Sequence, residues 1–236
     1  MSLAQSIQVE LVKMSSNDNY DGSFKVAIIG DIFVGKSSII QRVLGNGFND
    51  SYNTTAGFEF SILGAKINDK TLKLQLWDFS DKEIYEAIAK SVLYNSKLGI
   101  LVYDITNKET FEHIDIHLKK FKEETKEENL ILVGNKLDLE NKREVSTEEV
   151  EQKFKFSLNS DFKKFIECSA LSGDNIEEIF KEAARILYKQ IGLNSRQSKE
   201  YNKNEDLFIN ETTVEDYSQE IEKEKNKCKK CCCCFE

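Results

Sequence analysis

The stretch "FKVAIIGDIFVGKSS", residues 24–38, joins a short apolar run to a glycine-rich loop. Apolar runs of this length, with Val and Ile in succession, are typical of a strand that is buried on both faces. The following residues match the pattern G-x-x-x-x-G-K-[ST] from Gly30 to Ser37, and a helical pattern comes next. In that setting, backbone N–H groups and the positive end of the helix wrap phosphate groups. The stretch therefore predicts a strand, a phosphate-binding loop and a helix.

Each position of this loop has an expected role. We expect the Lys36 ammonium to reach the β and γ phosphates of a nucleotide and the Ser37 hydroxyl to bind Mg²⁺. An ordinary glycine-rich turn is the alternative, and the flanking strand and helix make it the weaker interpretation. The residues expected to surround the phosphates are Gly30, Ile32, Phe33, Val34, Gly35, Lys36, Ser37 and Ser38.

A second motif, "NKLD" at residues 135–138, indicates which nucleotide the loop binds. It ends another apolar run, and a carboxylate at Asp138 can accept hydrogen bonds from the N1–H and the exocyclic amine of guanine. Adenine has no such pair of donors on that edge. Alone, Asp138 could be a turn residue, but its position after a phosphate loop favours a guanine site. The expected ligands are GTP or GDP with Mg²⁺, rather than ATP.

The rest of the body alternates strands with helices. Apolar runs at residues 72–78, 98–104 and 130–136 predict further buried strands, which indicates a mostly parallel sheet flanked by helices. Residues 175–191 have one apolar stripe at helical spacing. The segment 57–77 alternates around "NDK" and predicts a hairpin that places one antiparallel strand at the sheet edge.

Composition limits the classes of function. With 236 residues, 40% of them hydrophobic, the chain is expected to form one domain, and no apolar run is long enough to span a bilayer. A formal net charge of −8 argues against binding to nucleic acid. We expect a flexible N-terminal extension over residues 1–22 and a flexible polar tether over residues 192–227.

The two ends of the chain carry different signals. The N-terminus lacks a secretory pattern and has no Gly at position 2, so we expect the protein to start in the cytosol. Five of the six cysteines lie in "CKKCCCCFE", residues 228–236, and the sixth is Cys168. Adjacent cysteines form no useful disulfide framework, and without His they fit a zinc site poorly.

Five segments taken in order resemble the nucleotide-binding segments of the small GTPases. They are "GDIFVGKSS", "TAGFEF", "WDFSDKE", "NKLD" and "ECSA", and the resemblance covers about residues 23–191. "TAGFEF", the "WD" pair and the cysteine-rich end are similar to the Rab branch. The resemblance implies an α/β fold, the P-loop small G domain, with a six-stranded, mostly parallel sheet, helices on both faces, and a monomeric state.

The resemblance also implies residue roles. Phe48 would flank the guanine ring, Thr55 would join Ser37 on Mg²⁺, and Asp78 would hold the metal through water. Phe60 and Trp77 would face effector proteins, although either side chain could equally belong to the core. The base site would be completed by Asn135, Lys136, Ser169 and Ala170.

The segment "WDFSDKE" departs from the family pattern D-T-A-G-Q-E. Asp81 replaces a Gly whose N–H contacts the γ phosphate, and Lys82 replaces the Gln that orients the attacking water. Two like charges about 4 Å apart repel by about 4 kcal/mol at an effective dielectric of about 20. An ammonium cannot align a water molecule as an amide does. Of the catalytic positions, Lys36 and Thr55 are therefore retained and the other two are degenerate, so hydrolysis is expected to be slow.

The phosphate loop departs from the pattern as well. Ile32 and Phe33 stand where many relatives have small residues. A side chain at the second position is tolerated in related branches. A branched residue at the first should crowd the space that an activating arginine enters, and such an arginine supplies about 10³ to 10⁵ in rate.

The C-terminus resembles a Rab double-geranylgeranyl signal. The expected sites are Cys233 and Cys234, while Cys231 and Cys232 are open alternatives for prenyl or palmitoyl groups. Lysines nearby would add attraction to anionic lipid; they are Lys223, Lys225, Lys227, Lys229 and Lys230.

Two functional interpretations follow from these features. The first is a switch in vesicle trafficking on the cytosolic face of an endomembrane or vesicle, served by effector, exchange-factor and GDI-like proteins. The alternative is a non-catalytic, GTP-bound scaffold. A P-loop ATPase or kinase is disfavoured by "NKLD".

Overall fold

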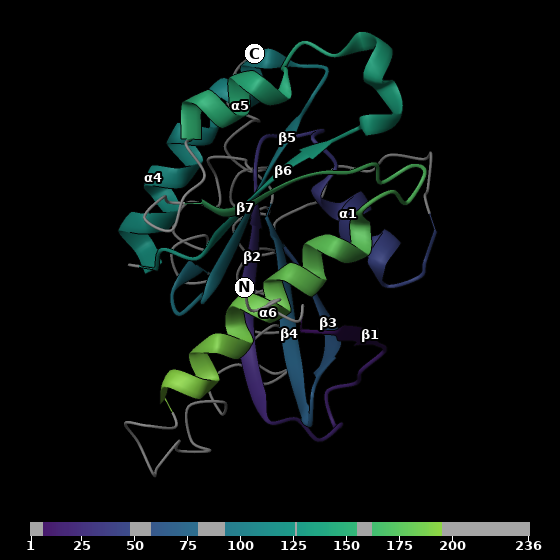
Figure 1. Ribbon diagram of the computed structural model, residues 1–236, viewed down its shortest axis with the longest axis vertical. Coiled ribbons are helices and arrows are strands. Elements are labelled where there is room, and N and C mark those ends of the chain that lie inside the picture. The colour runs from purple at the N-terminus through teal and green to yellow at the C-terminus, as the bar shows by residue number, and fades with distance from the viewer. Residues whose placement is uncertain (1–6, 48–57, 80–92, 126, 155–161, 195–236) are drawn as a thin grey trace, which may run out of the picture. The chain divides into compact units, whose positions relative to one another are not determined.

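The computed structural model describes residues 7–47, 58–79, 93–125, 127–154 and 162–194 (Figure 1). Its strands are β1 (Val9–Val12), β2 (Gly22–Ile29), β3 (Phe58–Ile67), β4 (Lys70–Phe79), β5 (Leu98–Asp104), β6 (Leu130–Asn135) and β7 (Phe162–Glu167). Its helices are α1 (Lys36–Val43), α3 (Lys108–Glu112), α4 (Ile114–Thr125), α5 (Thr147–Phe154) and α6 (Ile176–Asn194), with a 3-10 helix, η2 (Leu137–Lys142).

The strands form one sheet in the order β1-β3-β4-β2-β5-β6-β7. β2 pairs in parallel with β4 and with β5, and the β5–β6 and β6–β7 pairs are parallel too. The β1–β3 and β3–β4 pairs are antiparallel. This arrangement confirms the predicted α/β class and the mostly parallel sheet.

The structure of the N-terminal segment shows that two predictions were wrong, the number of strands and the strand at the sheet edge. Within the segment 1–22, residues Val9–Val12 form a strand that pairs with β3, so the sheet has seven strands rather than six and the edge is β1, not the hairpin. Val9 and Leu11 pack against the core, and Arg185 donates to the Ile7 carbonyl at 3.2 Å. The alternation in a four-residue strand is too short to stand out in the sequence, and its pairing partner lies more than fifty residues away.

Two apolar cores cover the two faces of the sheet. Alternate residues of β2 point to opposite faces, as the period of a strand requires: Val26 and Ile28 belong to one core, and Ala27 and Ile29 to the other. Residues of α1 and α6 complete the first core, and residues of α3, α4 and α5 complete the second. In Figure 1, α6 lies across the sheet in green. The inner strands are buried on both faces, which explains their continuous apolar runs.

The topology also decides where a ligand can bind. After β2 the chain builds β3 and β4 on one side and then crosses to β5 on the other. In sheets of this kind, ligands bind beyond the carboxyl ends of the strands, where the strand order reverses. The loop after β2 lies at this switch point.

Candidate functional site

The phosphate loop joins the end of β2 to the start of α1 in a conformation that needs glycine at two positions. A Cβ atom on Gly30 would lie 2.2 Å from the Val102 carbonyl oxygen, and one on Gly35 would lie 2.3 Å from Asn135 Nδ2. Gly35 also has a φ of 95°, which side chains disfavour. The pattern of glycines in the sequence therefore reflects close approaches to β5 and β6.

Lys36 is the first residue of α1 and is buried. Its ammonium donates to the Gly30 carbonyl at 2.7 Å and to the Asp31 carbonyl at 2.6 Å. These bonds hold the charge inside the loop, where phosphate oxygens are expected. Val34 is fully buried beneath the loop, and Ser38 is half-buried in α1.

Two of the predicted metal ligands come together. The Ser37 hydroxyl donates to the carboxylate of Asp78, which is buried at the end of β4. Mg²⁺ favours one or two protein oxygens supplemented by water and phosphate oxygens. The hydroxyl and the carboxylate therefore fit this ion, although the residues described contain no cluster of three or more His, Cys, Asp or Glu side chains suited to a metal.

The residues predicted to recognise the base lie together after β6 and β7. The Ser169 hydroxyl donates to the Asp138 carboxylate, and the Ala170 N–H donates to Asn135 Oδ1 at 3.1 Å. The Leu137 N–H donates to the Cys168 carbonyl at 2.9 Å. The segments "NKLD" and "ECSA", far apart in sequence, thus form one site.

Asn135 and Lys136 connect the base site to neighbouring loops. Asn135 Nδ2 donates to the Val34 carbonyl at 2.8 Å, which links the base site to the phosphate loop. Lys136 Nζ lies 2.6 Å from an Asp104 carboxylate oxygen at the end of β5. Sequence reasoning missed Asp104, because nothing in its local pattern shows that it faces Lys136.

Arg143 stabilises the segments that carry the predicted base site. Its guanidinium contacts the carboxylates of Glu140 and Glu167 at 2.6 to 2.9 Å and thereby ties η2 to β7. Hydrogen bonds to these carboxylates raise the pKa of Arg143, so the bridge stays charged. Nearby, burial raises the pKa of the Cys168 thiol well above its usual range, which makes that thiol unreactive.

The two unusual residues of the phosphate loop are exposed. Ile32 is 48% exposed and Phe33 is 54% exposed. Phe33 has a φ of 67°, a left-handed conformation that costs energy for a side chain of this size. The crowding of an activating arginine by Ile32 stays a prediction.

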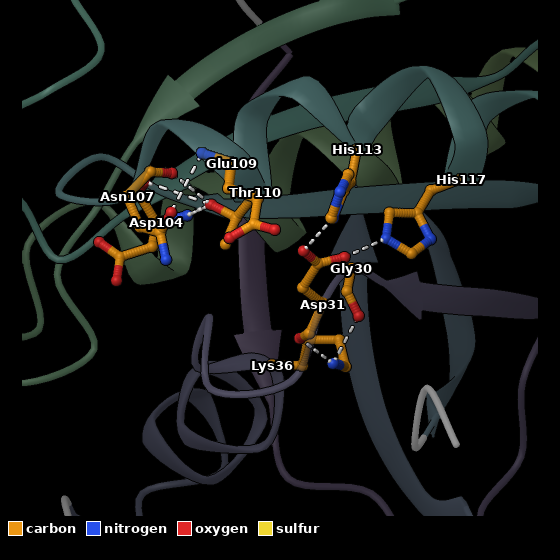
Figure 2. A network of polar contacts seen from close by, with 9 residues as sticks. All are labelled: Gly30, Asp31, Lys36, Asp104, Asn107, Glu109, Thr110, His113 and His117. Atoms are coloured by element: carbon orange, nitrogen blue, oxygen red, sulfur yellow. Dashed lines mark hydrogen bonds and ion pairs between the residues drawn. The ribbon is translucent and has the colours of Figure 1, made fainter. Parts of the chain in front are cut away.

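A polar network at Asp31 was also missed from the sequence. The Asp31 carboxylate accepts hydrogen bonds from His113 Nδ1 and His117 Nε2, both at 2.7 Å (Figure 2). A cavity of about 360 Å³ lies beside this network, between the phosphate loop and α3. Its lining includes the phosphate-loop residues Ile32, Phe33 and Val34, so the cavity adjoins the predicted phosphate site. In the sequence, only the spacing of the two histidines, four residues apart, could have indicated that they share one face of a helix.

The two aromatic residues predicted to face effectors pack on each other. Phe60 and Trp77 are cross-strand neighbours, with ring centroids 4.9 Å apart. Trp77 is only 2% exposed, while Phe60 is half-buried. Their effector role stays a prediction, in which a partner would meet Phe60 first. Several other predicted residues fall outside the described residues; they are Phe48, Thr55, Asp81, Lys82 and the C-terminal cysteines.

Lys25 contacts the other side of Trp77. Its ammonium lies 4.8 Å from the Trp77 ring centroid and donates to the Tyr94 carbonyl at 3.1 Å. Burial lowers the pKa of Lys25 from 10.5 to about 8. The folded chain therefore disfavours the charged form.

This burial predicts that Lys25→Met stabilises the protein at neutral pH. Below about pH 8, Lys25 is charged in both the folded and the unfolded chain, so the folded state bears the full free-energy cost of burying the charge. This cost disappears as the pH approaches 10.5. Because the contacts to Trp77 and Tyr94 offset part of the penalty, we expect a gain of about 1 to 2 kcal/mol in the free energy of unfolding. Urea unfolding across this pH range measures the gain in stability.

The exposed Lys70, whose pKa is raised by Asp21, is the control, and its methionine variant should give no gain. A less stable Lys25→Met at neutral pH would contradict the prediction.

Comparisons with known proteins agree with this geometry. The Ras family model matches residues 25–189. The chain is 39% identical over 178 residues to the Ras-related protein RABA1h of Arabidopsis thaliana, covering 75% of this chain and 79% of the relative. It is 39% identical over 178 residues to the Ras-related protein Rab11B of Nicotiana tabacum (75% and 80%) and 36% identical over 186 residues to the Ras-related protein Rab-11B of Dictyostelium discoideum (78% and 83%).

The family match and the assembled phosphate, metal and base residues point the same way. The chain therefore belongs to the Ras family and is a Rab-like small GTPase.

Proposed function

We propose that this protein is a guanine-nucleotide switch that attaches to membranes in vesicle trafficking and hydrolyses GTP slowly. The observation that carries the proposal is the bond from Asn135 Nδ2 to the Val34 carbonyl at 2.8 Å. This bond supports the proposal because it joins the phosphate loop to the segment that carries Asp138, the carboxylate proposed to select guanine. A nucleoside with a phosphate chain fits such a pair of sites better than either phosphate or base alone.

The proposed binding roles follow from the donors and acceptors present. The loop amides and Lys36 hold the phosphates, and Asp138 accepts from the guanine edge. Ser37, Thr55 and, through water, Asp78 hold Mg²⁺. When bound, this ion neutralises charge on the β and γ phosphate oxygens. Lys36 already lies against the loop carbonyls, so little rearrangement is needed to place its charge.

Slow hydrolysis is proposed from the chemistry of Asp81 and Lys82. A carboxylate at the position of the family's Gly repels the γ phosphate, and an ammonium does not orient water as an amide does. Ile32 would add to this effect, because a branched side chain at this exposed position would crowd the space that an activating arginine enters. The protein would then remain in its GTP state for longer than an ordinary Rab.

This proposal predicts that the double variant Asp81→Gly, Lys82→Gln hydrolyses GTP faster than the wild type. The expected gain in the single-turnover rate is about 10²-fold, the lower end of what a positioned proton-accepting or orienting group contributes. Lys66→Gln, which removes an exposed lysine from β3, is the matched control and should change nothing. Wild-type turnover as fast as that of an ordinary Rab would refute slow hydrolysis.

The nucleotide that copurifies with the protein separates the two interpretations of its function. GDP indicates turnover, which supports a slow switch. GTP indicates a stalled state, which favours the non-catalytic scaffold. If the protein purifies without either nucleotide, this result would argue against the binding site itself.

Membrane attachment is proposed from the C-terminus. Prenyl groups on Cys233 and Cys234, with Cys231 and Cys232 as alternatives, would act together with the neighbouring lysines, because stable anchoring needs two signals. Among the residues that the structure describes, no helix is both long enough and apolar enough to cross a bilayer. The proposed site of action is the cytosolic face of an endomembrane or vesicle, with effector, exchange-factor and GDI-like partners and a monomeric protein.

A further inference from the structure

Both histidines of the chain contact the same carboxylate. His113 Nδ1 and His117 Nε2 each lie 2.7 Å from one oxygen of Asp31, so each ring binds its own oxygen (Figure 2). His117 is 5% exposed. The side chains of His113 and Asp31 are 39% and 15% exposed. The cluster is therefore partly shielded from solvent, and water reaches it mainly at His113.

We call this arrangement, in which His113 and His117 both bind the Asp31 carboxylate, the clamp. The geometry of the helix makes it possible. His113 follows α3, and the His117 N–H donates to the His113 carbonyl at 3.1 Å, so the helical turn continues into α4. Residues four apart lie one above the other on a helix face. Both rings thus project from one face of the α3–α4 segment toward the start of the phosphate loop.

Asp31 connects these rings to the nucleotide-binding lysine. Its side chain accepts from the two histidines, while its backbone carbonyl accepts from Lys36 Nζ at 2.6 Å. A change in the hydrogen bonds to the Asp31 side chain therefore acts on the Asp31 carbonyl, which positions Lys36. The histidines and Lys36 are thus coupled through a single residue, Asp31.

The histidines keep the Asp31 carboxylate in its charged form. Burial acts to raise the pKa of Asp31, but hydrogen bonds from His117 and His113 outweigh it and hold that pKa below its usual value. The carboxylate is therefore ionised at physiological pH, and both rings donate to it. A histidine ring that gains a second proton adds positive charge without losing its first N–H donor.

The surrounding charges do not remove this effect. Among the described residues, Asp104 and Glu109 line the same cavity as His113 and Asp31. Asp104 is paired with Lys136 at 2.6 Å. In Figure 2, Glu109 lies on the opposite side of His113 from His117. Protonated rings would thus stand beside Asp31, close to the loop that wraps the phosphates.

We propose that His113 and His117 are positioning residues for the phosphate loop, and that their protonation slows the release of bound guanine nucleotide. The clamp fixes the Asp31 carbonyl and hence Lys36, and the added positive charge attracts the phosphates. The inference rests on the proposed nucleotide binding. It makes mild acidity a signal that lengthens the bound state.

The test measures the release of a fluorescent GDP analogue from the full chain at about pH 5.5 and about pH 7.5, on either side of the ordinary histidine pKa. His113→Asn/His117→Gln keeps a donor near each ring nitrogen but cannot titrate. His113→Ala/His117→Ala removes the donors. Lys119→Gln, which changes an exposed lysine on α4, is the control and should behave as the wild type. Melting temperatures show whether each variant is folded.

For the wild type, we expect release to be about threefold slower at the lower pH, the size of effect that one or two added charges give near a phosphate group. The Asn/Gln variant should release at the wild-type neutral rate at both pH values. The double-alanine variant should release about tenfold faster, because two charge-assisted hydrogen bonds are lost.

Different outcomes separate the two proposals. An Asn/Gln variant that keeps the wild-type pH response overturns the role of protonation, and this variant decides even where the alanine variant does not fold. A folded alanine variant with the wild-type neutral rate overturns the positioning role. Failure of the wild type to bind the GDP analogue would overturn the proposed function and this inference with it, whereas binding with an unaltered response overturns this inference alone.

Discussion

Asp138→Asn is expected to lower the affinity for GDP by about 10² to 10³-fold, because charge-assisted hydrogen bonds contribute about 1.5 to 3 kcal/mol each. The carboxylate can accept from both guanine donors, whereas an amide can accept only one and turns its own N–H₂ toward the other. Isothermal titration with GDP and ADP measures the change. The loss should be confined to guanine, so that the preference over adenine disappears.

Two comparisons sharpen this result. A purine with a carbonyl in place of the exocyclic amine should bind the Asn variant better than it binds the wild type, because the amide N–H₂ then has an acceptor. Glu151→Gln removes an exposed carboxylate from α5 and should leave GDP binding unchanged. An Asp138→Asn variant that still prefers guanine would show that Asp138 does not read the base.

Asn135→Ala is expected to weaken both stability and nucleotide binding. Asn135 is buried and bonds the Val34 carbonyl and the Ala170 N–H at 2.8 and 3.1 Å. Truncation leaves both backbone groups without these partners, at about 1 to 3 kcal/mol each. We expect the free energy of unfolding to fall by about 2 to 6 kcal/mol, a large fraction of the total for a domain. GDP affinity should fall by about 10²-fold, because two hydrogen bonds no longer hold the two half-sites together.

Urea unfolding with and without GDP measures both effects, since a ligand that binds only the folded state raises stability by mass action. Asn129 is the matched control, because it lies just before the other end of β6 and donates to the Lys97 carbonyl at 3.3 Å. Asn129→Ala should have a small effect on stability and none on binding. Equal losses from the two variants would show that the link to Val34 has no special role.

Much of the fold follows from local patterns in the sequence. The apolar runs of β2, β5 and β6 predicted strands buried on both faces, and their burial confirms it. These runs are readable because each strand contacts helices on both sides of the sheet. β1 was missed, since a four-residue strand has too little pattern of its own and depends on β3 for its hydrogen bonds.

The candidate site divides in the same way. Glycine at positions 30 and 35 and the order of "GDIFVGKSS" and "NKLD" were enough to predict a guanine-nucleotide site, because each motif acts through its own backbone and side chains. The sequence alone thus determined the α/β class and predicted where the phosphates and the base bind. Only the tertiary structure decided that Asn135 holds the phosphate loop, that Asp104 faces Lys136 and that both histidines bind Asp31. The reason is physical: such contacts join residues dozens of positions apart, and only the topology of the sheet brings them within hydrogen-bonding distance.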